Sequence, residues 1–384
     1  MRKTILSTAL FASALGFASC SHAQSGDGDT VELGEEAPFT ATSYGTFAAP
    51  WAIAFEPGTG RIFLTEKAGT IKFVAPATGT VGAVDGAPEV LNRGQGGLGD
   101  IAFAPDYAES GTVYITWAQP EGEGALAAMG RGTLVCHSDT HCELEDFSEI
   151  WRQSHVGERF GHYSHKIAFS PDGEYLFLAS GDRQEGDPAQ DLMDNRGAVL
   201  RLNLDGTAAE GNPFAEMGSP ADQIWSYGQR NLLGFEFAPD GNLWDLEHGP
   251  AGGDELNLVV RGANYGWPVR SNGDNYDGSD IPDHTEDDGF TKPAIFWNPV
   301  IAPSDMIFYT GDMFADWQGQ LLVTTLRTTA IARISVDAEA NSAGELARYT
   351  MPTRLRSIAE APDGAIWVAE DGGEGRLLRL TPAN

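Results

Sequence analysis

The chain has 384 residues and a formal net charge of −31. This excess of acidic residues repels polyanions at long range, so nucleic acid and anionic lipid surfaces are excluded as partners. The length suits either two ordinary domains or one large all-β domain, and internal repetition decides between them.

The first 23 residues predict an export signal. Arg2 and Lys3 precede an apolar run over residues 5–18, and small residues follow it. Cleavage would follow Ala23, or would precede Cys20 if that residue carries a lipid anchor. No later run reaches the ~18 apolar residues that a membrane-spanning helix needs. We therefore expect a periplasmic or secreted protein without a membrane span.

Residues 24–38 are rich in Gly, Asp and Glu, which predicts a flexible leader. Beyond it, one motif recurs about every 50 to 70 residues: a strand of alternating polarity, a turn such as Pro-Asp-Gly, and a second apolar strand. Its copies begin at Trp51, Asp100, Lys166, Gly234, Asp305 and Ser357, the copy at Asp305 being degenerate.

Each copy has the pattern of a β-hairpin, because Pro fixes φ and Gly supplies a positive φ in the turn. Hairpins that pack radially around an axis bury both faces, which a single hairpin cannot do. The sequence therefore predicts an all-β fold, a six-bladed β-propeller of four-stranded antiparallel blades over residues 39–384.

Two further features lie outside the repeat. Cys136 and Cys142 favour a short-loop disulfide in an exported protein, since no Cys or His cluster with zinc spacing surrounds them. Residues 271–292 form an acidic, Gly-rich insertion, which we expect to be a long loop on one rim. Its Asp274-Asn-Tyr-Asp-Gly stretch is not an EF-hand, because Tyr276 occupies a position that requires an oxygen ligand.

Function in a propeller is carried by the loops around the central channel. Polar and Gly-rich segments enter the second, third, fourth and sixth inner strands, and another follows the fourth hairpin: Gly94–Asp100, Gly161–Lys166, Gly228–Gly234, Thr353–Arg356 and Glu247–Asn257.

In this acidic chain, arginines are concentrated at those positions. Arg230, Arg354 and Arg356 lie just before or at the start of predicted inner strands. Arg327 lies just after a strand of the fifth repeat. Together they would bind a ligand with several negative charges, because guanidinium groups pair well with carboxylates. The alternative is that each arginine bridges neighbouring acidic loops.

These segments resemble the glucose/sorbosone dehydrogenase family, over Trp51 to Pro382. The resemblance is carried by Gln95-Gly-Gly-Leu, His162 with Lys166, Arg230-Asn231, Glu247-His-Gly-Pro250, Asp254-Glu-Leu-Asn257, Asn264-Tyr-Gly-Trp-Pro268, and Arg354 with Arg356. It implies a six-bladed propeller that oxidises aldose sugars with pyrroloquinoline quinone (PQQ) and calcium, as the soluble aldose sugar dehydrogenases do.

The resemblance also implies residue roles. The PQQ carboxylates would be bound by Arg230, Asn231, Arg327, Arg354 and Arg356. Carbonyls of Gly249 and Pro250 would hold the calcium ion that touches the quinone, and Glu255 with the Tyr265 carbonyl would hold a second, structural calcium.

His162 would be the general base that takes the proton from the anomeric hydroxyl while hydride passes to the quinone. His165 competes for this role. The family places its histidine four residues before a basic residue, and this spacing from Lys166 favours His162. Gln95, Asp100 and Tyr276 would lie on the substrate side.

The sequence departs from the family pattern at several positions. Lys166 replaces the usual Arg, Leu232-Leu233 replaces a Pro-Gln pair, Ser357 replaces an acid, and His165 stands where a small residue is usual. None of these changes removes an expected ligand, but His165 would alter the floor of the sugar pocket.

Two other functions fit the same fold. A calcium-dependent lactonase would need acidic or Asn ligands from several blades and would leave the arginines unused. A non-catalytic binding propeller would keep the fold alone. For the dehydrogenase we expect a separate electron acceptor and either a monomer or a homodimer.

Overall fold

The computed structural model describes residues 28–34 and 37–383. Strands dominate, and the one α-helix among these residues is the single turn α1 (Tyr107–Ser110). Short 3₁₀ turns are η1 (Asp187–Gln190), η2 (Ala215–Met217), η3 (Ala221–Gln223) and η4 (Ala315–Trp317). The predicted all-β class is confirmed. The predicted export signal, including Cys20, lies outside the described residues.

Three sheets have four antiparallel strands each. They are β11 (Ser164–Phe169), β12 (Tyr175–Ser180), β13 (Ala198–Asn203) and β14 (Ile224–Tyr227); β15 (Leu232–Phe237), β16 (Leu243–Glu247), β18 (Asp254–Leu258) and β20 (Ile295–Trp297); and β21 (Pro303–Phe308), β22 (Leu321–Thr325), β23 (Ala330–Asp337) and β24 (Ser342–Thr350).

One sheet has eight strands, which differs from the expected separate four-stranded blades. Its two halves are β3 (Pro50–Phe55), β4 (Ile62–Glu66), β5 (Thr70–Ala75) and β6 (Thr80–Asp85); and β7 (Leu98–Phe103), β8 (Thr112–Glu121), β9 (Gly124–Ser138) and β10 (His141–Arg152). They join because the start of β10, at His141–Glu143, pairs in parallel with the end of β6.

A five-stranded sheet brings both ends of the described chain together. Its order is β1 (Asp29–Val31), β2 (Phe39–Phe47), β27 (Gly375–Pro382), β26 (Ile366–Glu370) and β25 (Leu355–Glu360). A small two-stranded sheet pairs β17 (Ala251–Gly252) with β19 (Gly273–Asp274) on the rim.

The predicted flexible leader, residues 24–38, is wrong for its described part. Asp29–Val31 pair with β2, and Val31 is buried. Leu33 and Ala37 pack against the hydrophobic cluster of the last sheet. Three apolar side chains in the Gly- and acid-rich stretch are enough to attach it to an open sheet edge.

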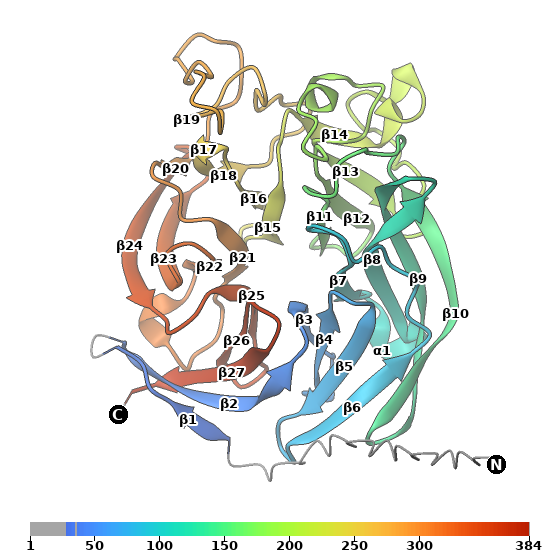
Figure 1. The fold of residues 1–384 in the computed structure, drawn as a ribbon, viewed down its shortest axis with the longest axis vertical. Coiled ribbons are helices and arrows are strands. Elements are labelled where there is room, and N and C mark those ends of the chain that lie inside the picture. Colours follow the sequence, from blue (N-terminus) through green and yellow to red (C-terminus); the bar gives the residue numbers. More distant parts are fainter. Residues whose placement is uncertain (1–27, 35–36, 384) are drawn as a thin grey trace, which may run out of the picture.

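The sheets surround a central axis (Figure 1). Each inner strand contacts the next in a closed ring: β3, β7, β11, β15, β21, β25 and β3 again. These strands are the first strands of the six repeat copies. The buried hydrophobic clusters follow the same order, each lying between neighbouring units.

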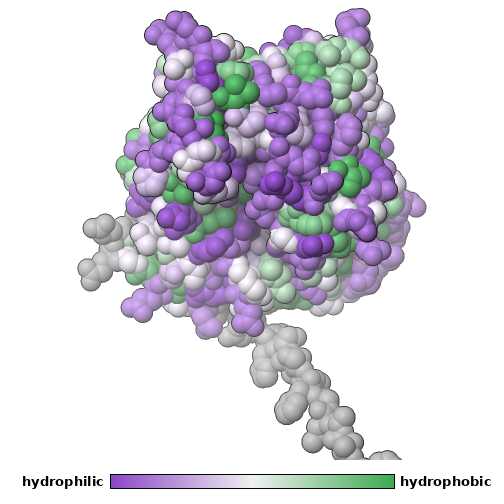
Figure 2. Space-filling model, turned by 45° about the horizontal axis from the view of Figure 1, so that its top comes forward, coloured by the Kyte–Doolittle hydropathy of each residue, from purple (hydrophilic) through white to green (hydrophobic). Residues whose placement is uncertain are grey.

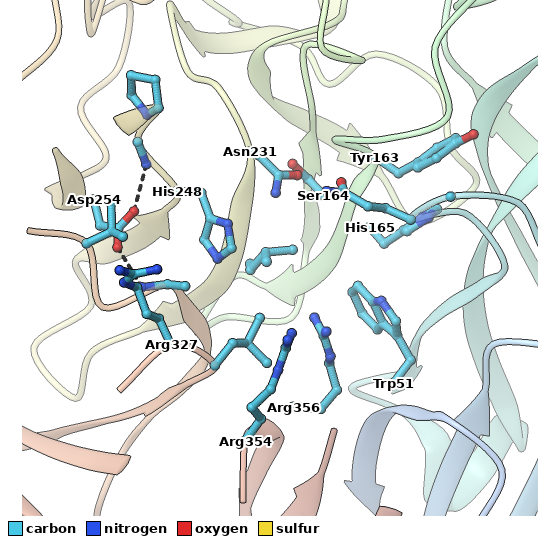
Figure 3. A pocket seen from close by; sticks show the side chains of 18 of the residues that line it. Trp51, Tyr163, Ser164, His165, Asn231, His248, Asp254, Arg327, Arg354 and Arg356 are labelled. Carbon is cyan, nitrogen blue, oxygen red and sulfur yellow. Dashed lines mark hydrogen bonds between the residues drawn. The ribbon is translucent and has the colours of Figure 1, made fainter. Parts of the chain in front are cut away.

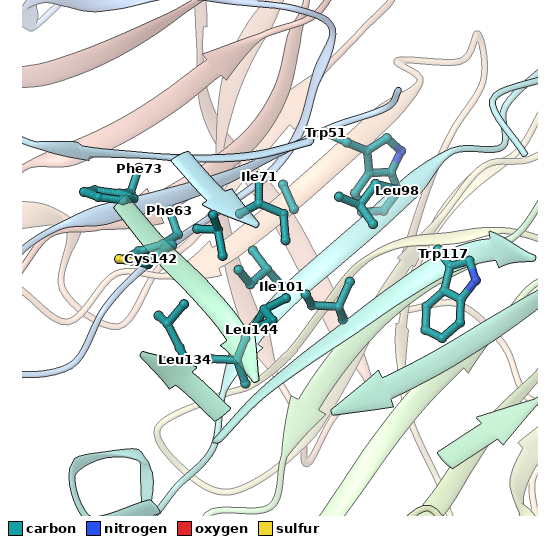
Figure 4. Close-up of a cluster of buried hydrophobic side chains, with 14 of the residues drawn as sticks. Trp51, Phe63, Ile71, Phe73, Leu98, Ile101, Trp117, Leu134, Cys142 and Leu144 are labelled. Carbon is teal, nitrogen blue, oxygen red and sulfur yellow. The ribbon is translucent and has the colours of Figure 1, made fainter. Parts of the chain in front are cut away.

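Figure 4 shows one such cluster, in which Trp51, Phe63 and Ile71 of the β3–β6 half pack with Leu98 and Ile101 of β7. The period-2 pattern of each strand presents apolar side chains to both neighbours, because both faces of every sheet inside the ring are covered.

The predicted disulfide between Cys136 and Cys142 is confirmed. It closes the hairpin between β9 and β10, and Arg61 donates a hydrogen bond of 3.2 Å to the sulfur of Cys136. The surface in Figure 2 is mostly hydrophilic, with small scattered hydrophobic groups, as the acidic composition predicts. Among the described residues, no helix has the length and hydropathy that crossing a membrane requires.

Candidate active site

A cavity of about 510 Å³ lies where the inner strands begin. Its lining includes residues at or just before the starts of β3, β7, β11, β15, β21 and β25, so all six repeats contribute to it. Eight of the predicted site residues line it: Gln95, Asn231, Gly249, Pro250, Tyr276, Arg327, Arg354 and Arg356. The predicted location of the site, at the entrance to the inner strands, agrees with this cavity.

One wall of the cavity is cationic. Arg354 and Arg356 project into it side by side (Figure 3). They share a single carboxylate, that of Asp371, which lies 2.9 Å from Nε of Arg354 and 2.8 Å from Nε of Arg356. Arg327 has no carboxylate partner among the described residues. Lys67, which the sequence did not single out, also lines this wall, and burial followed by repulsion from Arg356 lowers the pKa of its amine. The wall therefore carries more positive charge than its one acid neutralises.

Arg230 lies behind this cavity and lines a smaller one next to it. Its guanidinium group donates a hydrogen bond of 3.0 Å to the carbonyl of His248 and one of 3.3 Å to the hydroxyl of Tyr276. The neighbouring Asn231 does line the main cavity, and its side-chain oxygen is buried without a hydrogen-bond partner. A buried polar atom without a partner costs free energy, so a ligand that donates to Asn231 would offset that cost.

His162 forms a buried hydrogen-bonded pair with Asp182, with 2.7 Å between Nδ1 and the carboxylate. The same carboxylate accepts hydrogen bonds from the Trp267 indole at 2.7 Å and from the Gln184 amide. Burial lowers the pKa of His162, against the raising effect of Asp182, so the imidazole is neutral at neutral pH. A carboxylate at Nδ1 holds the proton there and leaves the Nε2 lone pair to accept another.

The segment that carries His162 has an unusual backbone. His162, Ser164 and His165 have φ values of 48°, 61° and 77°, a left-handed region that non-glycine residues rarely adopt. Buried Arg183 holds this segment, donating 3.0 Å to the carbonyl of Gly161 and stacking 3.6 Å over the ring of Tyr163. Gln95 accepts from the His162 amide at 2.8 Å. The position of the imidazole is thus fixed by the backbone as well as by Asp182.

His165 lies in the floor of the cavity rather than in a proton-relay pair. Its ring stacks on Tyr163 at 5.3 Å and meets Trp51 edge-on at 5.6 Å. Both ring nitrogens are buried without partners, and burial lowers its pKa to about 3. His162 therefore has the carboxylate partner that orients a base and His165 does not, whereas His165 rather than His162 lines the main cavity.

Gly249 and Pro250 form the turn after β16, at the boundary of the two cavities. Asp254 fixes this turn, because its carboxylate accepts hydrogen bonds from the backbone amides of Gly249, at 2.9 Å, and Ile301, at 2.8 Å. Glu255 and Tyr265 line only the smaller cavity. The Tyr265 hydroxyl donates a hydrogen bond to the Leu258 carbonyl, so its side chain is engaged away from any metal.

Two buried carboxylates, Glu247 and Glu255, line that smaller cavity, and Asp245 lies two residues before Glu247 on the same strand. Asp245 and Glu247 of β16 pair across the strands with Asn257 and Glu255 of β18. Burial, followed by repulsion from the Glu247 carboxylate, raises the pKa of Asp245 and of Glu255. Burial also raises the pKa of Glu247, to about 7. Side-chain oxygens of Asp245 and Asn257 are buried without partners. Such an oxygen-rich, uncompensated set fits a hard cation such as calcium.

Residues 47–379 match the family model described as Glucose / Sorbosone dehydrogenase. The chain belongs to this family.

Relatives of this family member cover most of its length. It is 34% identical to the aldose sugar dehydrogenase YliI of Escherichia coli, over 87% of this chain and 90% of that protein. It is 28% identical to quinoprotein glucose dehydrogenase B of Acinetobacter calcoaceticus, over 83% and 82%.

Solved structures agree with this assignment. The apo form of the soluble aldose sugar dehydrogenase of Escherichia coli has a TM-score of 0.83 at 32% identity, covering 90% of this chain and all of that one. The PQQ-bound aldose sugar dehydrogenase of Streptomyces coelicolor has a TM-score of 0.72 at 26% identity, covering 90% and 99%.

Asp100 of this glucose/sorbosone dehydrogenase family member lies outside the cavity, contrary to the prediction that it contacts substrate. Its carboxylate accepts 3.0 Å from the Ile167 amide and lies 3.8 Å from the Lys166 amine. The Lys166 amine is also 2.7 Å from the carboxylate of Asp305, which lies on the inner strand β21. The family resemblance implied a substrate-side place for Asp100, but the residue lies two residues inside β7 and points into the ring, where it balances a buried lysine.

Asp182 is the main residue that the sequence analysis missed. It comes two residues after the second strand of the third hairpin, and Glu247 is the last residue of the second strand of the fourth. A second hairpin strand returns to the rim from which the first one starts, so an acid at or just beyond its end lies beside the entrance segments. Applying this rule to every hairpin would have found Asp182.

The opposite end of the channel gives a pH-dependent prediction. Burial raises the pKa of Glu236 to about 8, and Asp305 and Glu360 add to the effect. The unfolded chain releases this proton near pH 4.5. Between those values the native state binds more protons, so the free energy of unfolding falls as pH rises, by about 2 to 4 kcal/mol from this group.

Glu236→Gln keeps an acceptor for the Phe308 amide and should flatten this dependence. Urea unfolding at pH 5 and pH 8.5 measures it, with the exposed Glu216→Gln as control. An equal loss of stability with pH in the wild type and in Glu236→Gln would contradict the prediction.

Proposed function

We propose that this protein oxidises aldose sugars to lactones with PQQ as electron acceptor and calcium as a bound cation. The observation that carries the proposal is the cavity at the entrance to the inner strands. In a chain of net charge −31, one cavity gathers Arg327, Arg354, Arg356 and Lys67. Of these, Arg354 and Arg356 share one carboxylate, that of Asp371. A polycarboxylate ligand supplies the negative charge that this wall lacks.

The residues that would hold PQQ come from several sheets. Arg327, Arg354 and Arg356 would pair with its carboxylates, and the unpartnered oxygen of Asn231 would accept a hydrogen bond. Arg230 would act from behind, because it orients the His248 carbonyl and Tyr276. When bound, PQQ would supply the two-electron acceptor that no amino-acid side chain provides.

His162 would remove the proton from the anomeric hydroxyl. Its neutral imidazole, oriented by Asp182, is the form that a general base requires. As the proton arrives at Nε2, the adjacent carboxylate would stabilise the imidazolium that forms. Gln95, which holds the His162 amide and lines the cavity, and the exposed Tyr276 would contact the sugar.

Calcium would occupy the two positions expected from the resemblance. Carbonyls of Gly249 and Pro250 would hold one ion at the border of the main cavity, where it would act as a Lewis acid. Glu255 and the Tyr265 carbonyl would hold the other, with Asp245 and Glu247 nearby to balance its charge.

We count six blades in this propeller. The closed ring of inner strands and the hydrophobic clusters between neighbouring units support the count, with the eight-stranded sheet as two blades joined at their outer edge. The fifth strand of the last sheet, β1, would be an addition to a four-stranded blade.

We further propose that the protein is exported, as a monomer or homodimer, and passes electrons to a separate acceptor. Residues 1–23 have the pattern of an export signal, with a lipid anchor at Cys20 as the alternative to cleavage after Ala23. The acidic surface excludes nucleic acid as a partner and suits a basic one.

A lactonase is less well supported. It would need acids from several blades around a catalytic calcium, and among the described residues that line the main cavity the acid is Asp254, whose two oxygens already accept backbone amides.

Reconstitution tests the proposal. Purified protein is mixed with PQQ and calcium chloride and assayed with a panel of aldoses and an artificial electron acceptor, with omission of PQQ as control. We expect sugar-dependent reduction of the acceptor only with PQQ present. No change in the PQQ spectrum together with no oxidation of any aldose would reject the dehydrogenase, and lactone hydrolysis without PQQ would favour the hydrolase.

A further inference from the structure

The hairpin between β9 and β10 carries a group of side chains that the sugar site does not use. The sequence Cys136-His-Ser-Asp-Thr-His-Cys142 forms its tip, and Glu143 and Glu145 follow on β10. The hairpin lies at the outer edge of the ring, away from the inner strands that line the cavity (Figure 1).

We propose that His137, Glu143 and Glu145 form a surface site for a divalent transition-metal ion of the zinc class. One ligand atom from each of the three side chains lies within 4.8 Å of the other two. The His137 Nε2 atom is 3.6 Å from a Glu143 carboxylate oxygen. All three side chains are exposed, so small rotations bring the donors around one ion.

Strand pairing explains the grouping. Glu143 and Glu145 are two residues apart on β10 and therefore project from the same face. Cys142 pairs with Cys136 and His141 with Ser138, which leaves His137 as the extra residue of a β-bulge. Bulges redirect a side chain relative to the regular strand, and here the imidazole meets the two carboxylates.

Charge also favours a cation at this position. Neither Glu143 nor Glu145 forms an ion pair with a lysine or arginine among the described residues. Two neighbouring carboxylates on one strand face repel each other, and a dication would neutralise both.

The donor set selects the metal class. An imidazole nitrogen with two carboxylate oxygens suits zinc, nickel or copper(II), whereas calcium and magnesium prefer oxygen alone. The cysteine sulfurs are excluded as ligands because they are bonded to each other. Water would complete the coordination, as in other three-ligand zinc sites.

The hairpin tip is held before any metal binds. The disulfide closes it, β10 pairs with β6 at His141–Glu143, and the His141 ring stacks on His137 at 5.6 Å. Donors on a constrained hairpin lose less conformational entropy on binding than donors on a free loop.

Calorimetric titration with zinc chloride tests the proposal. The protein is untagged and saturated with calcium, so the oxygen-rich sites are filled. We expect one zinc equivalent to bind the wild type, and His137→Ala and the double variant Glu143→Gln/Glu145→Gln each to bind at least about ten-fold more weakly.

His155→Ala is the matched control, because His155 is an exposed histidine 3.2 Å from the single carboxylate of Asp194. It should bind zinc as the wild type does. Thermal unfolding of each variant confirms that the exposed substitutions leave the fold intact. Absence of zinc binding to the wild type, or equal affinity in His137→Ala and the wild type, would overturn the proposal. Neither result bears on sugar oxidation.

Discussion

Replacing His162 with alanine should lower the turnover of the reconstituted enzyme by about 10²-fold or more, which is the contribution of a positioned general base. The affinity for PQQ should change little, because His162 is not among the residues that line the cationic wall. Steady-state kinetics with a saturating aldose measure the first effect, and titration with PQQ measures the second.

His165→Ala is the matched control for this variant. His165 is buried in the lining of the cavity, but it has no carboxylate partner; its ring stacks on Tyr163 and meets Trp51 edge-on. We expect it to affect KM through the floor of the cavity more than turnover. A larger loss of turnover in His165→Ala than in His162→Ala would show that the base has been misassigned.

Arg356→Ala should weaken PQQ binding by about 10- to 100-fold, the range for a charge-assisted hydrogen bond. The variant leaves no isolated acid behind, because Asp371 keeps its contact with Arg354 at 2.9 Å. Turnover at saturating PQQ should change less than affinity, since Arg356 is assigned no role in proton transfer.

Arg348→Ala provides the comparison at equal change in charge. Arg348 lies on the outer strand β24 and pairs with Glu345 three residues before it. If both variants weakened PQQ binding equally, the effect would come from net charge rather than from a specific contact. Unchanged PQQ affinity in Arg356→Ala would remove this arginine from the cofactor site.

The repeat pattern predicted the fold well because local chemistry sets it. Each Pro-Asp-Gly turn and each alternating strand specifies its own hairpin, and the ring follows from the number of hairpins. The pairing of β6 with β10, which joins the first two units into one sheet, was not predictable. It depends on how far β10 extends beyond the repeated motif. The attachment of Asp29–Val31 was missed because composition dominated the interpretation of residues 24–38.

For the site, position along the chain was informative and side-chain direction was not. Arg354, Arg356 and Asn231 at strand entrances, and Arg327 just after the end of a strand, reach one cavity as their positions predicted. Asp100 has a comparable place but lies just inside its strand and points toward Lys166. Arg230 points behind the cavity toward His248. Lys67 belongs to no recurring motif, so no sequence pattern marked it.

The pairing of β2 with β27 has a consequence for how the molecule folds. The hydroxyls of Thr40 and Thr381 are 3.1 Å apart although 341 residues separate them along the chain. During synthesis, β2 emerges long before its partner β27. The edge of β2 that pairs with β27 therefore stays open until β27 has been made. Ring closure is therefore a late, non-local step, of the kind that slows folding. Until it occurs, the unpaired edge is where two incomplete chains would associate.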